Sequence, residues 1–131
     1  MKKTMLVILL LLAVTLTACG SSQAEPTLAP VPADYAGKSN PLGADASSAG
    51  AAVFKTNCEP CHGAQGHGDG PIGIALEPAP KNLAEFQATT GDDYLFWRVS
   101  AGKEGTSMQA WKGILTDEQI WQAIAFIRTL K

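Results

Sequence analysis

The chain has 131 residues, of which 46% are hydrophobic, and this size and composition fit one small globular domain rather than a disordered or fibrous protein. Its formal net charge is −2, from 10 basic and 12 acidic residues. The lysines are scattered along the chain and form no basic patch or stripe, so the composition argues against nucleic-acid binding.

The first residues have the pattern of a secretory signal peptide. Lys2 and Lys3 precede an unbroken apolar run over residues 5–14, after which small and polar residues follow. This run is well short of the ~20 apolar residues that a membrane-spanning helix needs. We therefore predict a signal peptide over residues 1–18, with an uncleaved anchor helix as the alternative. Its removal would leave 8 basic and 12 acidic residues.

Cys19 directly follows this segment, at the end of the sequence Leu16-Thr17-Ala18-Cys19. These four residues resemble the lipobox of bacterial lipoproteins, whose cysteine sulfur carries a diacylglycerol and becomes the first residue of the mature chain. The resemblance implies attachment to membrane lipid through Cys19, at the outer face of the cytoplasmic membrane. Two or more lipid chains hold a protein stably on a bilayer. The alternative is that Cys19 is one small residue at the end of an ordinary signal, or a free thiol.

Residues 19–45 are rich in Ser, Ala, Gly and Pro and show neither a helical nor an alternating apolar period. Such a composition predicts a flexible linker that lets the following domain move away from the lipid surface. The predicted organisation is therefore a signal peptide over residues 1–18, a lipid anchor and linker over residues 19–45, and a folded domain over residues 46–131.

Three short helices are predicted in the folded domain, and no segment has a convincing strand period. The first covers residues 45–57, with Asp45 among its candidate caps, and the second covers residues 90–102. The third starts with Thr116-Asp117-Glu118-Gln119, a capping box, and continues with isoleucines at helical spacing. Glycines and prolines interrupt residues 63–80, which predicts a long loop. Such short helices bury too little apolar surface to be stable alone, so a large apolar group is expected among them.

The motif Cys58-Glu59-Pro60-Cys61-His62 is typical of covalent haem attachment. Its two thiols can add to the two vinyl groups of a haem, and the next residue, His62, then lies beneath the iron. The predicted signal sequence directs the chain to the compartment where bacteria attach haem. A haem would also be the apolar group that completes the small core.

Two other interpretations of the cysteines remain open at this point. The first is a thiol–disulfide redox pair, although it explains neither His62 nor the small core, and the chain lacks the βαβ pattern of thioredoxin-like proteins. The second is a zinc site formed by Cys58, Cys61, His62 and His67, although His62 directly follows Cys61 and leaves no chain to wrap a tetrahedron. We predict that His67 is instead a solvated loop residue.

The order of helix, CxxCH motif, glycine-rich loop, methionine loop and C-terminal amphipathic helix resembles class I c-type cytochromes over residues 46–131. The resemblance implies an all-α cytochrome c fold, with three to four short helices and long loops around one covalently bound haem c. Residues 105–111 are similar to the family's G-T-x-M-P-A-W ligand loop, with Gln109 where proline is common. This similarity implies that Met108 is the distal iron ligand and His62 the proximal one.

The same resemblance implies further contacts around the haem. The carbonyl of Pro71 would accept a hydrogen bond from the imidazole of His62, unless Pro71 is simply a turn proline. The indole N–H of Trp111 would donate to a haem propionate, unless Trp111 only packs. Gly50 and Phe126 would form the contact between the first and last helices.

An iron held from both sides has no open coordination position, so the resemblance implies a single-electron carrier rather than an enzyme. The chain also lacks a nucleophile–base pair and a nucleotide-binding motif. The expected partners are redox proteins, namely a quinol-oxidising complex, an oxidase or a photosynthetic reaction centre. The chain would serve either as a tethered shuttle or as a subunit of a complex such as alternative complex III. The alternatives are a haem-based gas sensor in which Met108 is labile and a thiol–disulfide redox protein.

Overall fold

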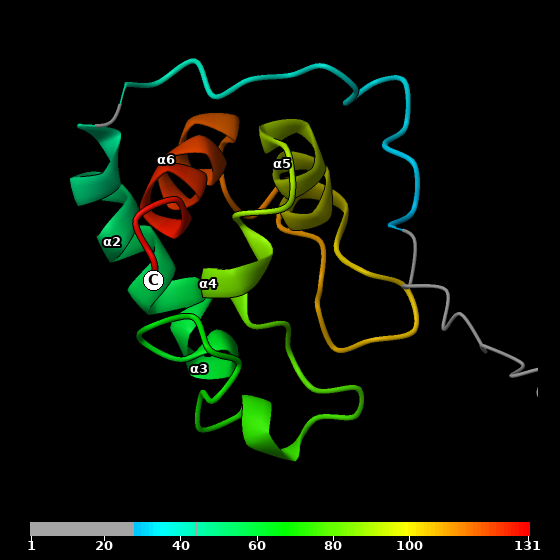
Figure 1. Ribbon diagram of the computed structural model, residues 1–131, viewed down its shortest axis with the longest axis vertical. Helices are drawn as coiled ribbons and strands as arrows, with labels where there is room; N and C mark the ends of the chain where they lie inside the picture. Colours follow the sequence, from blue (N-terminus) through cyan, green and yellow to red (C-terminus); the bar gives the residue numbers. More distant parts are fainter. Residues whose placement is uncertain (1–27, 44) are drawn as a thin grey trace, which may run out of the picture.

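The computed structural model describes residues 28–43 and 45–131, so the predicted signal peptide and Cys19 lie outside the described residues. The described part is helical and contains no strand, which confirms the predicted all-α fold. Its elements are α2 (Ala46–Asn57), α3 (Glu59–His62), the 3-10 turn η1 (Gly73–Ala75), α4 (Leu83–Phe86), α5 (Asp92–Ala101) and α6 (Asp117–Ile127) (Figure 1). None of these helices is long and apolar enough to cross a membrane.

The C-terminal helix α6 is the centre of the core. It begins at the predicted capping box, where the Gln119 N–H donates to Thr116 Oγ1 over 3.2 Å and the Thr116 N–H donates to Gln119 Oε1 over 2.9 Å. Ile120 and Ile124 on the inner side of the helix are completely buried. The core cluster combines side chains from α2, α4, α5, α6 and the residues after α6. It consists of Phe54, Ala84, Leu95, Phe96, Val99, Ile120, Trp121, Ile124, Ile127 and Leu130.

Helix α2 crosses α6 at Gly50, which is the contact predicted with Phe126. A Cβ atom at Gly50 would collide with the backbone carbonyl of Gln122 and lie 3.0 Å from Phe126 Cβ. One turn further along α2, the ring of Phe54 packs against that of Phe126 with centroids 5.0 Å apart. The missing side chain at Gly50 therefore allows the two helices to approach closely enough for the aromatic pair to form.

The helix boundaries differ from the predicted ones in small ways. Asp45 precedes α2 as expected, but its side chain makes no capping hydrogen bond. Helix α5 starts two residues later than predicted because Gly91 is still extended, and it ends at Gly102 as predicted. Helices α3 and α4 have only four residues each, which is too short to show an apolar period in the sequence.

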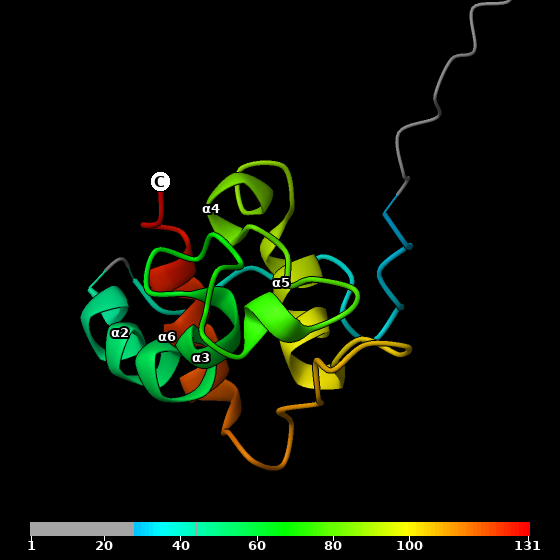
Figure 2. The same ribbon diagram turned by 90° about the horizontal axis from the view of Figure 1, so that it is seen from below.

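Residues 28–43, which we call the strap, belong to the segment predicted as linker but lie against the helices (Figures 1 and 2). A turn closes where the Ala36 N–H donates to the Pro32 carbonyl over 2.9 Å. The ring of Tyr35 then packs on that of Phe96 in α5 with centroids 6.1 Å apart. The boundaries at residues 18 and 45 stay predictions, but residues 28–43 are docked rather than flexible as their composition suggests.

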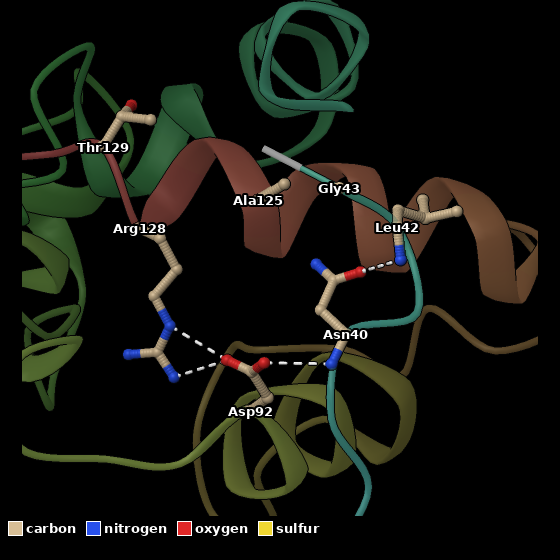
Figure 3. A pocket seen from close by; sticks show the side chains of 7 residues that line it. All are labelled: Asn40, Leu42, Gly43, Asp92, Ala125, Arg128 and Thr129. Carbon is tan, nitrogen blue, oxygen red and sulfur yellow. Dashed lines mark hydrogen bonds and ion pairs between the residues drawn. The ribbon is translucent and has the colours of Figure 1, made fainter. Parts of the chain in front are cut away.

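Three residues, which we call the clasp, lie where the strap meets α5 and α6: Asn40, Asp92 and Arg128 (Figure 3). Arg128 Nη2 lies 2.7 Å from Asp92 Oδ1, and the Asn40 N–H donates to Asp92 Oδ2 over 2.9 Å. Asn40 Nδ2 donates to the Trp121 carbonyl over 2.9 Å. Partial burial raises the pKa of Asp92, but the hydrogen bonds from Asn40 and Arg128 outweigh it, so this pKa is lowered from 3.8. Asp92 is therefore ionised and bonded at neutral pH.

We expect Gly50→Ala to lower the free energy of unfolding by roughly 1–3 kcal/mol, because the added methyl group forces α2 away from α6. Thermal unfolding of the purified protein measures this loss. Gly43→Ala is the matched control, since a Cβ atom there meets nothing within 4 Å. Equal melting temperatures of the two variants would contradict close packing at this crossing.

Candidate functional site

One helical turn at the end of α2 holds the two thiols and the imidazole of the CxxCH motif. Cys58 connects α2 to α3, and its carbonyl accepts hydrogen bonds from the Cys61 N–H over 3.1 Å and from the His62 N–H over 2.8 Å. Cys58 and Cys61 are both half-buried free thiols. The turn therefore presents two sulfur atoms and one ring from a rigid stretch of backbone.

The backbone fixes the orientation of the His62 ring. Its Nδ1 lies 3.1 Å from the carbonyl oxygen of Lys81. A carbonyl can only accept a hydrogen bond, so Nδ1 carries the proton and Nε2 keeps its lone pair for a metal. Burial lowers the pKa of His62 from 6.5, although the hydrogen bond to Lys81 opposes this change. At neutral pH the ring is therefore neutral, the form that binds iron.

The acceptor of this hydrogen bond differs from the predicted one. We expected the carbonyl of Pro71 in this place, but the structure puts the carbonyl of Lys81 there. Pro71 is exposed and does not line the cavity described below, whereas Lys81 does. The chain returns past His62 in the segment before α4, ten residues beyond Pro71. Lys81 therefore orients the imidazole in place of Pro71.

The loop after α5 positions Met108. Gly102 ends α5 with φ of +70°, and a Cβ atom there would lie only 2.6 Å from the Met108 carbonyl oxygen. The Lys103 N–H donates to that carbonyl over 2.9 Å, and the Met108 N–H donates to Thr106 Oγ1 over 3.2 Å. The Trp111 N–H donates to the Val99 carbonyl over 3.1 Å, which ties the end of the loop back to α5. These contacts hold the thioether in a defined place.

A cavity of about 1080 Å³ lies between these two parts of the chain. Its volume is at the upper end of the ~300–1,000 Å³ that is usual for cofactor sites. Cys58, Cys61 and His62 line it from the α3 region, and Met108 and Trp111 line it from the loop after α5. Figures 1 and 2 both place that loop across from α3. The structure thus brings the predicted thiols and both predicted iron ligands to one cavity.

Three cationic side chains line this cavity, and no acidic residue of the described chain does so. They are Lys81, Arg98 and Lys103. The guanidinium of Arg98 lies 3.7 Å from the centroid of the Trp97 ring, and its Nε donates to Tyr94 Oη over 3.2 Å. In a chain of net charge −2, such a lining indicates a ligand that is apolar in bulk and carries anionic groups.

Comparison with known families matches residues 45–127 to the family described as "Cytochrome C oxidase, cbb3-type, subunit III". The chain belongs to this family of c-type cytochrome domains. The match confirms the class I c-type cytochrome predicted from the CxxCH motif and the methionine loop. Comparison with curated proteins finds none that matches.

A solved structure of a related chain agrees with this assignment. A chain described as "Kuenenia stuttgartiensis reducing HAO-like protein complex Kustc0457/Kustc0458" is 30% identical to this cytochrome, with a TM-score of 0.56. The similarity covers 61% of this chain and 40% of that one. The cytochrome therefore spans less than half the length of this relative.

The family implies a covalently bound haem c, and the cavity of this cytochrome fits one. Cys58 and Cys61 would bind the porphyrin edge, while His62 and Met108 would bind the iron. The three cations suit the propionate carboxylates. Trp111 lines the same cavity, and a hydrogen bond from its indole to a propionate stays a prediction.

Sequence reasoning missed Lys81 and Arg98. Arg98 had a signal, since it lies one turn after Tyr94 and beside Leu95 and Val99, on the apolar side of α5. A cation in that position indicates either an ion pair or an anionic ligand. Lys81 had no signal, because its contribution to His62 is a backbone carbonyl, which every residue has.

The structure weakens both alternative roles of the cysteines. Burial, and to a lesser degree the neighbouring Cys61, raises the pKa of Cys58 to about 12. Redox-active dithiols need the opposite, a lowered pKa that supplies thiolate. His67 is exposed, and its Nε2 lies 3.3 Å from the Lys131 carbonyl oxygen rather than in the cavity. No group of three or more His, Cys, Asp or Glu in the described residues could hold a metal ion, as the zinc interpretation requires.

We expect Arg98→Leu to lower the reduction potential of the cytochrome by tens of millivolts. A cation on the cavity wall favours the less positive ferrous state, and a unit charge about 10 Å away contributes ~1.7 kcal/mol at an effective dielectric constant of about 20. Optical redox titration measures the potential. Lys112→Leu is the control, because Lys112 is exposed and does not line the cavity. Equal shifts in both variants would show that Arg98 acts only through net charge.

Proposed function

We propose that this protein is a membrane-anchored monohaem cytochrome c that passes single electrons between redox proteins at the outer face of the cytoplasmic membrane. The observation that carries the proposal is the shared cavity of His62 and Met108. With His62 and Met108 as its ligands, the iron of a bound haem would keep no open position for oxygen or a substrate. The cytochrome c family supports an electron carrier rather than an enzyme.

Bound haem c supplies the one-electron redox centre. The residues around the haem determine its reduction potential. The neutral thioether of Met108 favours ferrous iron and raises the potential, as do the three cations of the cavity wall. His62 is held in one orientation by Lys81, so little rearrangement of the protein accompanies a change of charge. Fast electron transfer benefits from such a rigid ligand set.

The proposed anchor is a lipid on Cys19, which the lipobox-like sequence supports. Tyr35 is the first residue of the strap that packs on an aromatic ring of the helices, so the fifteen residues from Gly20 to Asp34 separate Cys19 from this contact. Fifteen residues span at most roughly 50 Å when fully extended. The domain would therefore work close to the membrane surface, where partners embedded in the membrane expose their own redox centres.

The proposed partners are a quinol-oxidising complex on one side and an oxidase or reaction centre on the other. The cytochrome would be either a tethered shuttle or a subunit of a respiratory or photosynthetic complex, such as alternative complex III or a terminal oxidase. The family description names an oxidase subunit, and the Kuenenia relative is described as part of a protein complex, which supports redox proteins as partners. Contact with such partners is expected to be small, below ~1,200 Å² in total.

We expect the oxidised protein to show a weak band near ~695 nm that Met108→Ala abolishes, because that band reports a thioether bound to ferric c-type haem. The variant should also have a lower reduction potential. Optical spectra of the full chain, produced with haem-attachment machinery, test this in both redox states. Ser107→Ala is the control, since Ser107 lies beside Met108 in the same loop. A colourless wild-type product would refute the haem assignment itself, and an unchanged band in Met108→Ala would refute Met108 as ligand.

We expect Cys19→Ala to move the protein from the membrane fraction to the soluble fraction or to leave its signal uncleaved, because the thiol that accepts the lipid is lost. Fractionation of the producing cells, with mass spectrometry of the N-terminus, measures both outcomes. Ser22→Ala should remain in the membrane and carry the lipid mass. A lipid-free wild-type protein would contradict the anchor without affecting the haem assignment.

A further inference from the structure

The strap reaches the haem cavity. Leu28 and Ala29, at its N-terminal end, are among the residues that line the cavity of about 1080 Å³. Leu28 is 46% exposed, and few other large apolar side chains in the described part of the chain are as accessible. Figures 1 and 2 show that the strap runs along the outside of the helices before it reaches α2. A segment outside the expected cytochrome fold thus contributes to the wall of the site.

Contacts further along the strap hold this end in place. The Gly37 N–H donates to Asp93 Oδ2 over 3.0 Å, and Asn40 bonds both Asp92 and the Trp121 carbonyl. The turn of the chain at residues 32–38 is closed by its own backbone hydrogen bonds. The strap is therefore fastened to the start of α5, next to the turn that leads to its N-terminal end.

Aromatic rings connect the strap to the core on which the cavity depends. The Tyr35 ring packs on Phe96, which is stacked on Trp121 of α6 with centroids 4.1 Å apart. Phe96 lies on α5 beside Leu95, whose side chain lines the cavity. The strap thus covers the outer side of the helix whose other side forms the cavity wall.

We propose that Leu28 and Ala29, at the N-terminal end of the strap, form part of the wall of the haem pocket and limit the access of water to the haem edge, and that the contacts of residues 35–40 with α5 and α6 hold them there. The inference rests on the haem assignment and does not depend on the lipid anchor. It assigns Leu28 to the pocket and Asn40 as a positioning residue that acts through the strap. Excluding water disfavours the more highly charged ferric state, so a closed strap raises the reduction potential.

The first measurement is trypsin cleavage after Lys38 in the full-length haem protein. Lys38 is exposed but lies between two attachment points of the strap, so cleavage requires the strap to detach. Asn40→Ala removes two side-chain hydrogen bonds and is expected to accelerate cleavage at this site by at least about tenfold. Ser39→Ala, a neighbouring exposed position without a side-chain contact to the helices, should cleave at the wild-type rate.

The second measurement is the reduction potential, with the rate of haem reduction by a small hydrophilic reductant beside it. We expect both Asn40→Ala and the wild-type protein cut after Lys38 to have a lower potential and faster reduction, with Ser39→Ala unchanged. Leu28→Asp places a carboxylate in the pocket wall and should lower the potential without accelerating cleavage. This variant tests the proposal even if Asn40→Ala does not fold.

A released strap with an unchanged potential and reduction rate would overturn the proposal, because the strap would then only brace α5 and α6. An unchanged potential in Leu28→Asp would overturn it as well. Failure of the haem assignment is distinguishable, since it gives a colourless protein whose cleavage at Lys38 still responds to Asn40→Ala.

Discussion

The close crossing of α2 and α6 at Gly50 is the contact on which the site depends. Since Gly50 has no side chain, the backbones approach and Phe54 packs on Phe126. The CxxCH turn continues directly from α2, so this crossing also determines where the two thiols and the imidazole point. Helix α5 packs against the same α6 and carries the methionine loop at its end. Both sides of the haem cavity therefore take their positions from one central helix.

The charges of the molecule are divided between its surface and its cavity. The chain as a whole is slightly acidic. Among the described residues, however, every charged residue that lines the cavity is a cation. Such a distribution suits an apolar cofactor that carries carboxylates at one edge. Trp97 and Tyr94 hold the guanidinium of Arg98 in place without neutralising its charge, so it stays able to pair with an anionic group. The same cations favour the reduced state of a redox centre.

The strap connects the N-terminal side of the small domain with its redox site. Three hydrogen bonds from the strap reach side chains or backbone of α5 and α6, namely those from Gly37 to Asp93 and from Asn40 to Asp92 and Trp121. The chain that leads to the membrane in the proposed function therefore passes over the haem pocket before it enters the folded core. With the proposed lipid on Cys19, such a carrier would have a restricted orientation relative to the membrane.

The sequence alone determined the CxxCH turn, the capping box at Thr116 and the end of α5 at Gly102, because each depends on residue types at fixed short spacings. The convergence of His62 and Met108 came from the resemblance of the chain to class I c-type cytochromes, since the two residues are far apart in the sequence. Only the tertiary structure decided that Lys81 rather than Pro71 orients His62, because every residue carries the same carbonyl and only the path of the loop selects one. It likewise decided that residues 28–43 dock, because their hydrogen-bond partners lie more than 50 residues away and a Pro-rich composition does not reveal them.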